Sequence, residues 1–195
     1  MRGCREAARL YDWGWSFDGV PRDVAKALAL HRKACDGGYF LACDDLGWLL
    51  PSGDDVTHDV DAAVALFHKA CDGGAMHGCT SYGYAYEKGL GVTADLVTAR
   101  ALYMKACDGA DYQGCDNTAL LDVGTDDEHA LVMFDRAYAL DSGYGCKRAA
   151  ALYRAAHRIP EAIERYRHAC RKYEQDAYCE LVPGNGDCMQ RALSP

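Results

Sequence analysis

The sequence predicts an all-α fold, namely a right-handed α/α solenoid of stacked helix pairs, and three observations predict it. The segment Lys-Ala-Cys-Asp-Gly begins at Lys33, Lys69 and Lys105, which sets a period of 36 residues. A second cysteine follows the first by eight residues in each copy. Small and aromatic residues recur around both cysteines at spacings of three, four and seven, which place them on one helical face. A lone unit of this kind cannot bury its apolar face, so stacked units are expected.

The second helix of each pair ends near the first cysteine. Alanine stands one and eight residues before this position in all five copies, and an aromatic ring or a histidine stands four residues before it. The small residues allow a neighbouring helix to approach closely, and the ring fills the core beside them. An aspartate twelve residues before the same position fits the N-cap, because its carboxylate accepts backbone N–H groups. The four aspartates are Asp23, Asp59, Asp95 and Asp126.

The first helix of each pair begins near the second cysteine. Four residues after that cysteine the residue is always small, and seven residues after it the residue is mostly large. Glycine-rich segments turn the chain back between the two helices, and a tight Asp-Gly-Gly turn leads into the next pair. We therefore expect one array over residues 1–182, followed by a C-terminal break and a short tail at 183–195. The expected helix pairs lie near residues 4–36, 40–72, 76–108, 112–140 and 144–173.

Composition and charge exclude several classes of protein. Apolar residues make up 50% of the 195 residues, which excludes a disordered chain. The sequence carries 21 Lys and Arg against 29 Asp and Glu, so its formal charge of -8 disfavours general binding to nucleic acid. Because no uninterrupted apolar stretch of about 18 residues is present, we expect no membrane insertion. We expect the protein to be a monomer.

Several motif positions resemble Sel-1-like repeats. The pairs Leu46-Gly47 and Tyr82-Gly83 resemble the Leu-Gly of the first helix in those repeats. The loop and second helix are matched by Gly91-Val92-x-x-Asp95-x-x-x-Ala99 and Lys105-Ala106. The added Cys-x7-Cys spacing resembles the disulfide-bearing subclass, the Helicobacter cysteine-rich protein family. The resemblance covers residues 4–180 and implies an exported, non-catalytic scaffold that binds protein or peptide partners on the concave face of the solenoid.

The same resemblance implies an alternative function, because some members of that family are reported to bind penicillins or to have weak β-lactamase activity. Such chemistry needs a serine beside a base. None of the serines begins Ser-x-x-Lys, and neither Lys-Thr-Gly nor Gly-x-Ser-x-Gly occurs. The enzyme hypothesis therefore rests on the resemblance, and we assign no catalytic residue and no cofactor.

The cysteines allow three interpretations, and the resemblance favours disulfides. The first cysteine ends one helix and the second begins the next, so a tight turn can bring their Cα atoms within about 4.4–6.8 Å. Reduced structural thiols are one alternative, and a zinc site is the other, although no Cys-x-x-Cys is present. Disulfides would indicate a periplasmic or extracellular protein. The expected pairs are Cys35 with Cys43, Cys71 with Cys79, Cys107 with Cys115, and Cys170 with Cys179.

Three cysteines stay free or unassigned in this scheme. Cys4 occupies the place of a second cysteine, and we expect its partner to lie upstream of this chain. Cys146 faces Tyr138 where a first cysteine would stand, so we expect a buried free thiol. Cys188 is unplaced and could compete with Cys179 for Cys170.

The first helices of such pairs usually line the concave face, which makes their outward positions candidates for partner binding. We expect the residues one and five positions after each second cysteine to project from that face. Aromatic groups there suit recognition of a peptide or protein. The alternative is that Trp48 and Tyr84 pack between repeats. The six candidate residues are Asp44, Trp48, Thr80, Tyr84, Asp116 and Leu120.

Overall fold

The computed structural model describes residues 2–13, 23–52 and 59–155, and within them every regular element is an α-helix. The chain divides into two compact units, residues 1–109 and 110–195, which are described separately. The helices of the first unit are α1 (Arg2–Trp13), α2 (Val24–Asp36), α3 (Leu41–Ser52), α4 (Val60–Asp72), α5 (Met76–Lys88) and α6 (Leu96–Asp108). Those described in the second unit are α7 (Tyr112–Asp122), α8 (Asp127–Ala139) and α9 (Gly143–Ala155).

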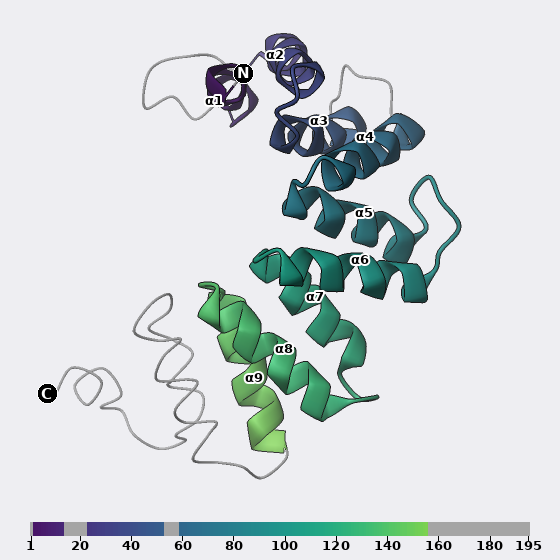
Figure 1. Cartoon of the computed structure of the whole chain (residues 1–195), viewed down its shortest axis with the longest axis vertical. Helices are drawn as coiled ribbons and strands as arrows, with labels where there is room; N and C mark the ends of the chain where they lie inside the picture. The colour runs from purple at the N-terminus through teal and green to yellow at the C-terminus, as the bar shows by residue number, and fades with distance from the viewer. Residues whose placement is uncertain (1, 14–22, 53–58, 156–195) are drawn as a thin grey trace, which may run out of the picture. The chain divides into compact units, whose positions relative to one another are not determined.

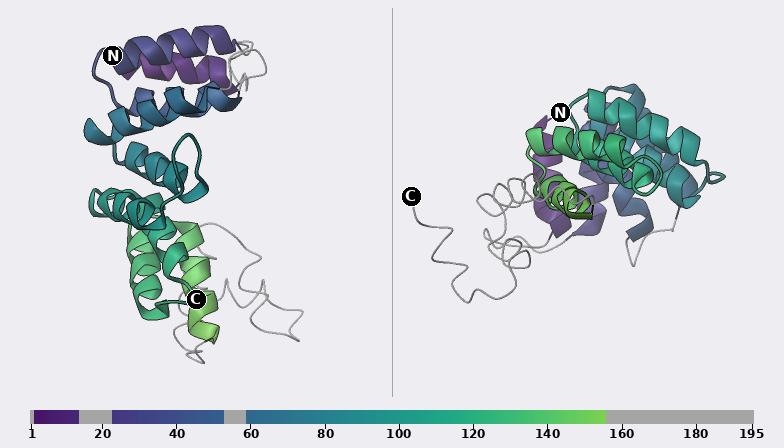
Figure 2. Two further views of the ribbon diagram at one scale, coloured as in Figure 1. Left: turned by 90° about the vertical axis from the view of Figure 1, so that its right-hand side faces the viewer. Right: turned by 90° about the horizontal axis from the view of Figure 1, so that it is seen from below.

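The helices of the first unit form three consecutive pairs (Figure 1). Helix α1 packs on α2, α3 on α4 and α5 on α6, and each pair also packs on the next. A further contact between α3 and α5 places the first helices of neighbouring pairs side by side (Figure 2). We call α1, α3 and α5 the A helices and α2, α4 and α6 the B helices. The predicted all-helical repeat architecture is confirmed in this unit.

The second unit continues the same order of elements. Helix α7 packs on α8, and α8 packs on α9. These three helices correspond to the fourth expected pair and to the first helix of the fifth. The rest of the fifth pair and the tail at 183–195 lie outside the described residues.

The predicted aspartates cap the second helix of each described repeat. The Asp23 carboxylate accepts a hydrogen bond from the backbone N–H of Lys26 at 3.0 Å, and Asp59 accepts one from Ala62 at 2.9 Å. These bonds satisfy N–H groups that have no partner inside the helix. Asp95 and Asp126 cap α6 and α8 in the same way, through the backbone N–H groups of Val97 and His129.

In the pairs α3 with α4 and α5 with α6, the A helix crosses its B helix at a glycine. A Cβ atom added to Gly47 would lie 2.5 Å from Cε1 of Phe67, and one added to Gly83 would lie 2.8 Å from the ring of Tyr103. Both rings are buried. The crossing therefore brings an aromatic ring of one helix against the bare backbone of the other, as the spacing of small and aromatic residues predicted.

The turns between pairs need a backbone conformation that favours glycine. Gly38 has φ of 82° and Gly74 has φ of 84°, and each is the second glycine of an Asp-Gly-Gly turn. Glycine enters this left-handed region without the steric cost that a side chain adds. The resulting sharp turn brings the end of a B helix beside the start of the next A helix.

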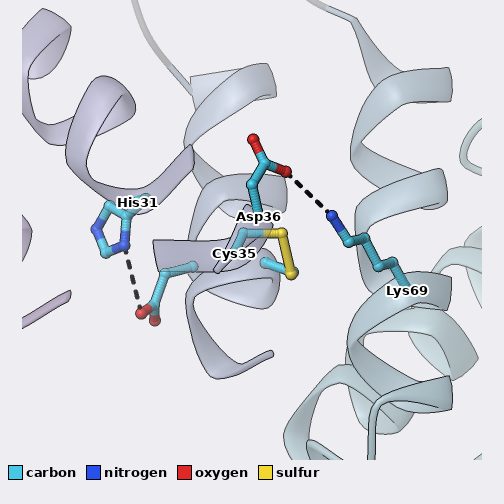
Figure 3. Close-up of a disulfide and its surroundings, with 6 residues drawn as sticks. His31, Cys35, Asp36 and Lys69 are labelled. Carbon is cyan, nitrogen blue, oxygen red and sulfur yellow. Dashed lines mark hydrogen bonds and ion pairs between the residues drawn. A yellow bond between two sulfur atoms is a disulfide. The ribbon is translucent and has the colours of Figure 1, made fainter. Parts of the chain in front are cut away.

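Two disulfides close these turns in the first unit. Cys35 is bonded to Cys43, with Cα atoms 4.7 Å apart, and Cys71 is bonded to Cys79, with Cα atoms 4.4 Å apart. Figure 3 shows the Cys35 disulfide beside an ion pair in which Lys69 Nζ lies 3.1 Å from Asp36 Oδ1. The disulfide joins α2 to α3, and the ion pair joins α2 to α4.

The remaining cysteines differ in whether they are disulfide-bonded. Cys107 and Cys115 are both disulfide-bonded. Cys4 carries a free thiol and packs against the buried cluster that contains the Cys35–Cys43 disulfide. The predictions for Cys170, Cys179 and Cys188, and for the Cys146 side chain, fall outside the described residues and side chains. Among the helices that the structure describes, none has the length and apolar character needed to cross a membrane.

Removing one disulfide should lower the free energy of unfolding of the first unit. The double substitution Cys71→Ala with Cys79→Ala opens a loop whose cysteines are eight residues apart. We expect a fall of about 2–3 kcal/mol in the free energy of unfolding, because the unfolded chain regains loop entropy. Urea unfolding of the oxidised proteins measures this. Cys4→Ala is the control that removes a cysteine without breaking a disulfide, and equal midpoints for the double variant and this control would contradict the expectation.

Candidate functional site

The structure corrects half of the predicted binding face. The residues one position after each second cysteine are buried, with exposed fractions of 2% for Asp44, 6% for Thr80 and 5% for Asp116. They do not project from the surface, so that part of the prediction is wrong. For Asp44 and Asp116 the physical reason is that the side chain faces the start of a following helix in the same unit, α5 and α9 respectively. In both units the buried carboxylate has a polar partner there, His77 for the first aspartate and Ser142 for the last.

The residues five positions after each second cysteine do reach the surface. Trp48 is 43% exposed, Tyr84 is half-buried and Leu120 is 38% exposed. Leu120 belongs to the second unit and the two aromatic residues belong to the first. We call Trp48 and Tyr84 together the aromatic surface. It lies on two neighbouring A helices, α3 and α5.

Trp48 packs between repeats, as the alternative interpretation expected, and it also stays partly exposed. Its indole N–H donates a hydrogen bond to Ser81 Oγ at 2.8 Å. Its ring centroid lies 5.2 Å from that of Phe67 and 5.7 Å from that of Tyr84. Tilted ring pairs at these separations are favourable. Ser81, Phe67 and Tyr84 thus hold the indole in place, while 43% of the residue stays exposed to solvent.

A buried carboxylate lies one helical turn before Trp48 on α3. Oδ2 of Asp44 is 3.6 Å from Nε2 of His77, whose side chain is partly exposed at the start of α5. A buried charge is costly unless it has a partner, and this histidine provides one when it is protonated. Asp44 therefore ties α3 to α5 rather than offering a charge to a ligand.

Charged groups lie beside Tyr84 at the far end of α5. The ammonium nitrogen of Lys88 is 5.8 Å from the centroid of the Tyr84 ring, within reach of a cation–π interaction. The pKa of Lys88 is raised by its hydrogen bond to Glu87. Glu87 also accepts a hydrogen bond from the buried hydroxyl of Tyr103 at 2.7 Å. Burial raises the pKa of that tyrosine, so its hydroxyl stays a donor.

A second polar cluster joins the first two A helices. The guanidinium of Arg5 on α1 donates two hydrogen bonds to the Asp45 carboxylate on α3. This contact raises the pKa of Arg5. Nδ1 of the buried His31 ring lies 3.6 Å from Asp45 Oδ2, and Figure 3 marks this contact with the dashed line from His31. His31 is the histidine that stands four residues before the first cysteine, and it is buried as the spacing predicted. The sequence did not predict the contact of Arg5 with Asp45.

In the second unit the buried carboxylate of Asp116 holds the start of α9. Ser142 Oγ donates to Asp116 Oδ2 at 2.6 Å and accepts from the backbone N–H of Gly145 at 3.0 Å. Asp116 Oδ1 has no hydrogen-bond partner among the described residues. Burial raises the pKa of Asp116 to about 6, although the serine bond acts in the opposite direction and nearby Asp111 adds to the rise.

The described residues do not form a metal-binding cluster, since no three of their His, Cys, Asp and Glu side chains converge. His129 Nδ1 lies 2.6 Å from Asp122 Oδ2, but this pair joins the start of α8 to the end of α7. Ser81 and Ser142 are both buried, and the hydroxyl of each is hydrogen-bonded to a side chain of the preceding repeat. Neither serine is presented to solvent as a nucleophile.

The chain matches the family model described as Sel1 repeat three times, over residues 2–39, 41–74 and 77–111. These matches together cover more than half of its length. Comparison with curated protein sequences finds no matching relative.

Similar solved structures share the repeat fold. A Sel1 repeat protein from Oxalobacter formigenes has a TM-score of 0.80 at 22% identity, over 97% of this chain and 84% of that chain. Cysteine rich protein B from Helicobacter pylori has a TM-score of 0.51 at 26% identity, over 68% of this chain and 97% of that chain. Immunity protein Pa5087 from Pseudomonas aeruginosa has a TM-score of 0.66 at 16% identity, over 90% of this chain and 67% of that chain.

The raised pKa of Asp116 predicts that acid stabilises the second unit. A folded-state pKa of about 6 lies above the ordinary value of 3.8, so protonation favours the folded state. This contribution is complete below about pH 4 and is lost as the pH rises through 6. Asp116→Asn stays neutral at every pH. Relative to this variant, the wild type should lose about 1–2 kcal/mol of unfolding free energy between pH 5 and pH 7.5.

Urea unfolding at the two pH values measures this difference. Glu128→Gln, which neutralises an exposed carboxylate of α8 in the same unit, is the matched control. The assignment fails if Asp116→Asn and the control show the same change between pH 5 and pH 7.5.

Proposed function

The chain belongs to the Sel1 repeat family, and we propose that it is a non-catalytic scaffold that binds a protein or peptide segment on its aromatic surface. Sel1 repeats typically mediate protein interactions. The observation that carries the proposal is the state of Trp48, which is 43% exposed although its N–H and one edge are held by the repeat. A large apolar group that is both exposed and fixed is typical of the centre of a binding surface.

The fixed position of the indole favours binding for an energetic reason. Ordering a mobile side chain on association costs about 0.5–1.5 kcal/mol. The hydrogen bond to Ser81 and the ring contacts with Phe67 and Tyr84 already impose this order in the unbound protein. A partner that covers the indole therefore gains apolar burial while meeting little of the ordering cost.

The disulfides indicate an oxidising compartment, since thiols stay reduced in most cytosols. Within that class we propose the periplasm or the extracellular space. We further propose that the protein acts as a monomer and does not bind nucleic acid, which its formal charge of -8 supports.

Substitution of the indole tests the proposal. Labelled wild-type protein is applied to an array of immobilised random peptides, together with Trp48→Ala and Tyr144→Ala. Tyr144 is 45% exposed in the second unit, so its substitution removes an exposed ring from another place. We expect Trp48→Ala to weaken capture of the bound peptides by about tenfold or more, as loss of a central aromatic residue does.

The control variant, Tyr144→Ala, should retain wild-type binding of the peptides. A further variant, Trp48→Phe, keeps an aromatic ring but loses the hydrogen bond to Ser81. Circular dichroism checks that each variant is folded. If folded Trp48→Ala captured the same peptides as strongly as the wild type, the aromatic surface would not be the binding site.

A further inference from the structure

Two side-chain contacts join α3 to α5, and they lie one helical turn apart on both helices. In the first, Oδ2 of Asp44 is 3.6 Å from Nε2 of His77. In the second, the indole N–H of Trp48 donates to Ser81 Oγ at 2.8 Å. Trp48 follows Asp44 by four residues and Ser81 follows His77 by four residues, so the two contacts are neighbours along both helices. The contact that holds the indole therefore lies directly after a contact between a carboxylate and a histidine.

The first of these contacts depends on the charge of the histidine. The Asp44 side chain is 2% exposed, whereas that of His77 is 43% exposed and can exchange a proton with solvent. A buried carboxylate is tolerated as an anion when a cation lies beside it, and its charge is costly when none does. Imidazole gains or loses its proton between about pH 5 and pH 8. The contact is therefore an ion pair in acid, and it loses this attraction as the pH rises.

The corresponding ties elsewhere in the array use groups of a different kind. Arg5 of α1 donates two hydrogen bonds to Asp45 of α3, and a guanidinium stays charged throughout this pH range. In the second unit Asp116, the equivalent of Asp44, accepts from the hydroxyl of Ser142. The partner of Asp44 thus changes its charge near neutral pH, whereas Arg5 and Ser142 do not.

Other charged groups on the helices packed against α3 and α5 have contacts of their own. His31 of α2 is buried 3.6 Å from Asp45, whose carboxylate already accepts from Arg5. Lys105 and Asp108 of α6 are exposed. We therefore assign His77 as the group that titrates against the buried Asp44. The ion pairs on α2, α4 and α5 are Lys69 with Asp36, His68 with Asp72, and Lys88 with Glu87.

From these contacts we infer that Asp44 and His77 form a pH-dependent tie that makes binding on the aromatic surface stronger in acid than at neutral pH. The inference rests on the proposed function and adds its regulation. In acid the ion pair holds α3 against α5, and one turn further along Ser81 lies where it accepts the indole N–H of Trp48.

Loss of the proton from His77 has the opposite effect. The uncompensated charge of Asp44 then favours separation of the two helices at this point, because separation lets water reach the carboxylate. The bond from Trp48 to Ser81 is broken in a larger fraction of the molecules. A partner that needs the ordered indole binds to fewer of them, so its apparent affinity falls.

Nuclear magnetic resonance of the indole N–H tests the tie without any partner. The chain has three tryptophans, and Trp48→Phe identifies the signal of Trp48. We expect its chemical shift to move through one transition between about pH 5 and pH 8 as His77 loses its proton. In His77→Gln the shift should stay constant over this range. The matched control is His68→Gln, an exposed histidine of α4 that pairs with Asp72, and this variant should retain the wild-type transition.

Peptide binding at two pH values tests the consequence. Peptides that the array captures through Trp48 and that lack titratable groups are labelled, and fluorescence anisotropy gives their dissociation constants. We expect the wild type and His68→Gln to bind about fivefold more tightly at pH 5.5 than at pH 7.5, and His77→Gln to bind equally at both. Asp116 is present in all three proteins, so differences between them report the tie.

Each outcome decides between the inference and the function on which it rests. Loss of the transition and of the pH dependence in His77→Gln alone supports the inference. A transition that is absent from the wild type, that persists in His77→Gln or that is lost in His68→Gln overturns it. Equal or weaker binding at pH 5.5, with capture still lost in Trp48→Ala, overturns the inference and leaves the scaffold function standing. Capture that is insensitive to Trp48→Ala, or no capture of any peptide, overturns both.

Discussion

In the second and third pairs, the contact between a glycine of the A helix and an aromatic ring of the B helix is the constraint on which the first unit depends. Gly47 meets Phe67, and Gly83 meets Tyr103, at distances that leave no room for a Cβ atom. This close approach sets the spacing within a pair, and the disulfides set the step from one pair to the next. Equivalent positions of α3 and α5 therefore come to lie side by side, as the contact between Trp48 and Tyr84 shows.

The aromatic surface is a direct consequence of that spacing. Phe67 fills the crossing at Gly47 and also supports the ring of Trp48. Ser81 is buried at the next A helix and receives the indole N–H. The same contacts that hold the repeat together therefore hold Trp48 in an exposed and fixed position. The side chain that we propose as the binding group is thus held by the same contacts that stabilise the repeat.

The sequence was informative wherever a residue acts within its own repeat. Aspartates such as Asp59 at helix starts, the cysteines of each turn and the small residues at the crossings all follow from local spacing. It was less informative about contacts between repeats. Helical period alone cannot tell which of two neighbouring outward positions turns towards the next A helix, so Asp44 was placed on the surface although it is buried. The ion pair of Arg5 and Asp45 was missed for the same reason.

Substitution of Gly47 tests the central claim most directly. The free energy of unfolding of Gly47→Ala is compared with that of Gly3→Ala, since Gly3 lies in α1 with open space around it. The account predicts a loss of about 1–3 kcal/mol for Gly47→Ala, because the added methyl displaces a buried ring. It predicts no loss for Gly3→Ala, where alanine favours the helix. A variant at Gly47 as stable as the one at Gly3 would contradict the account.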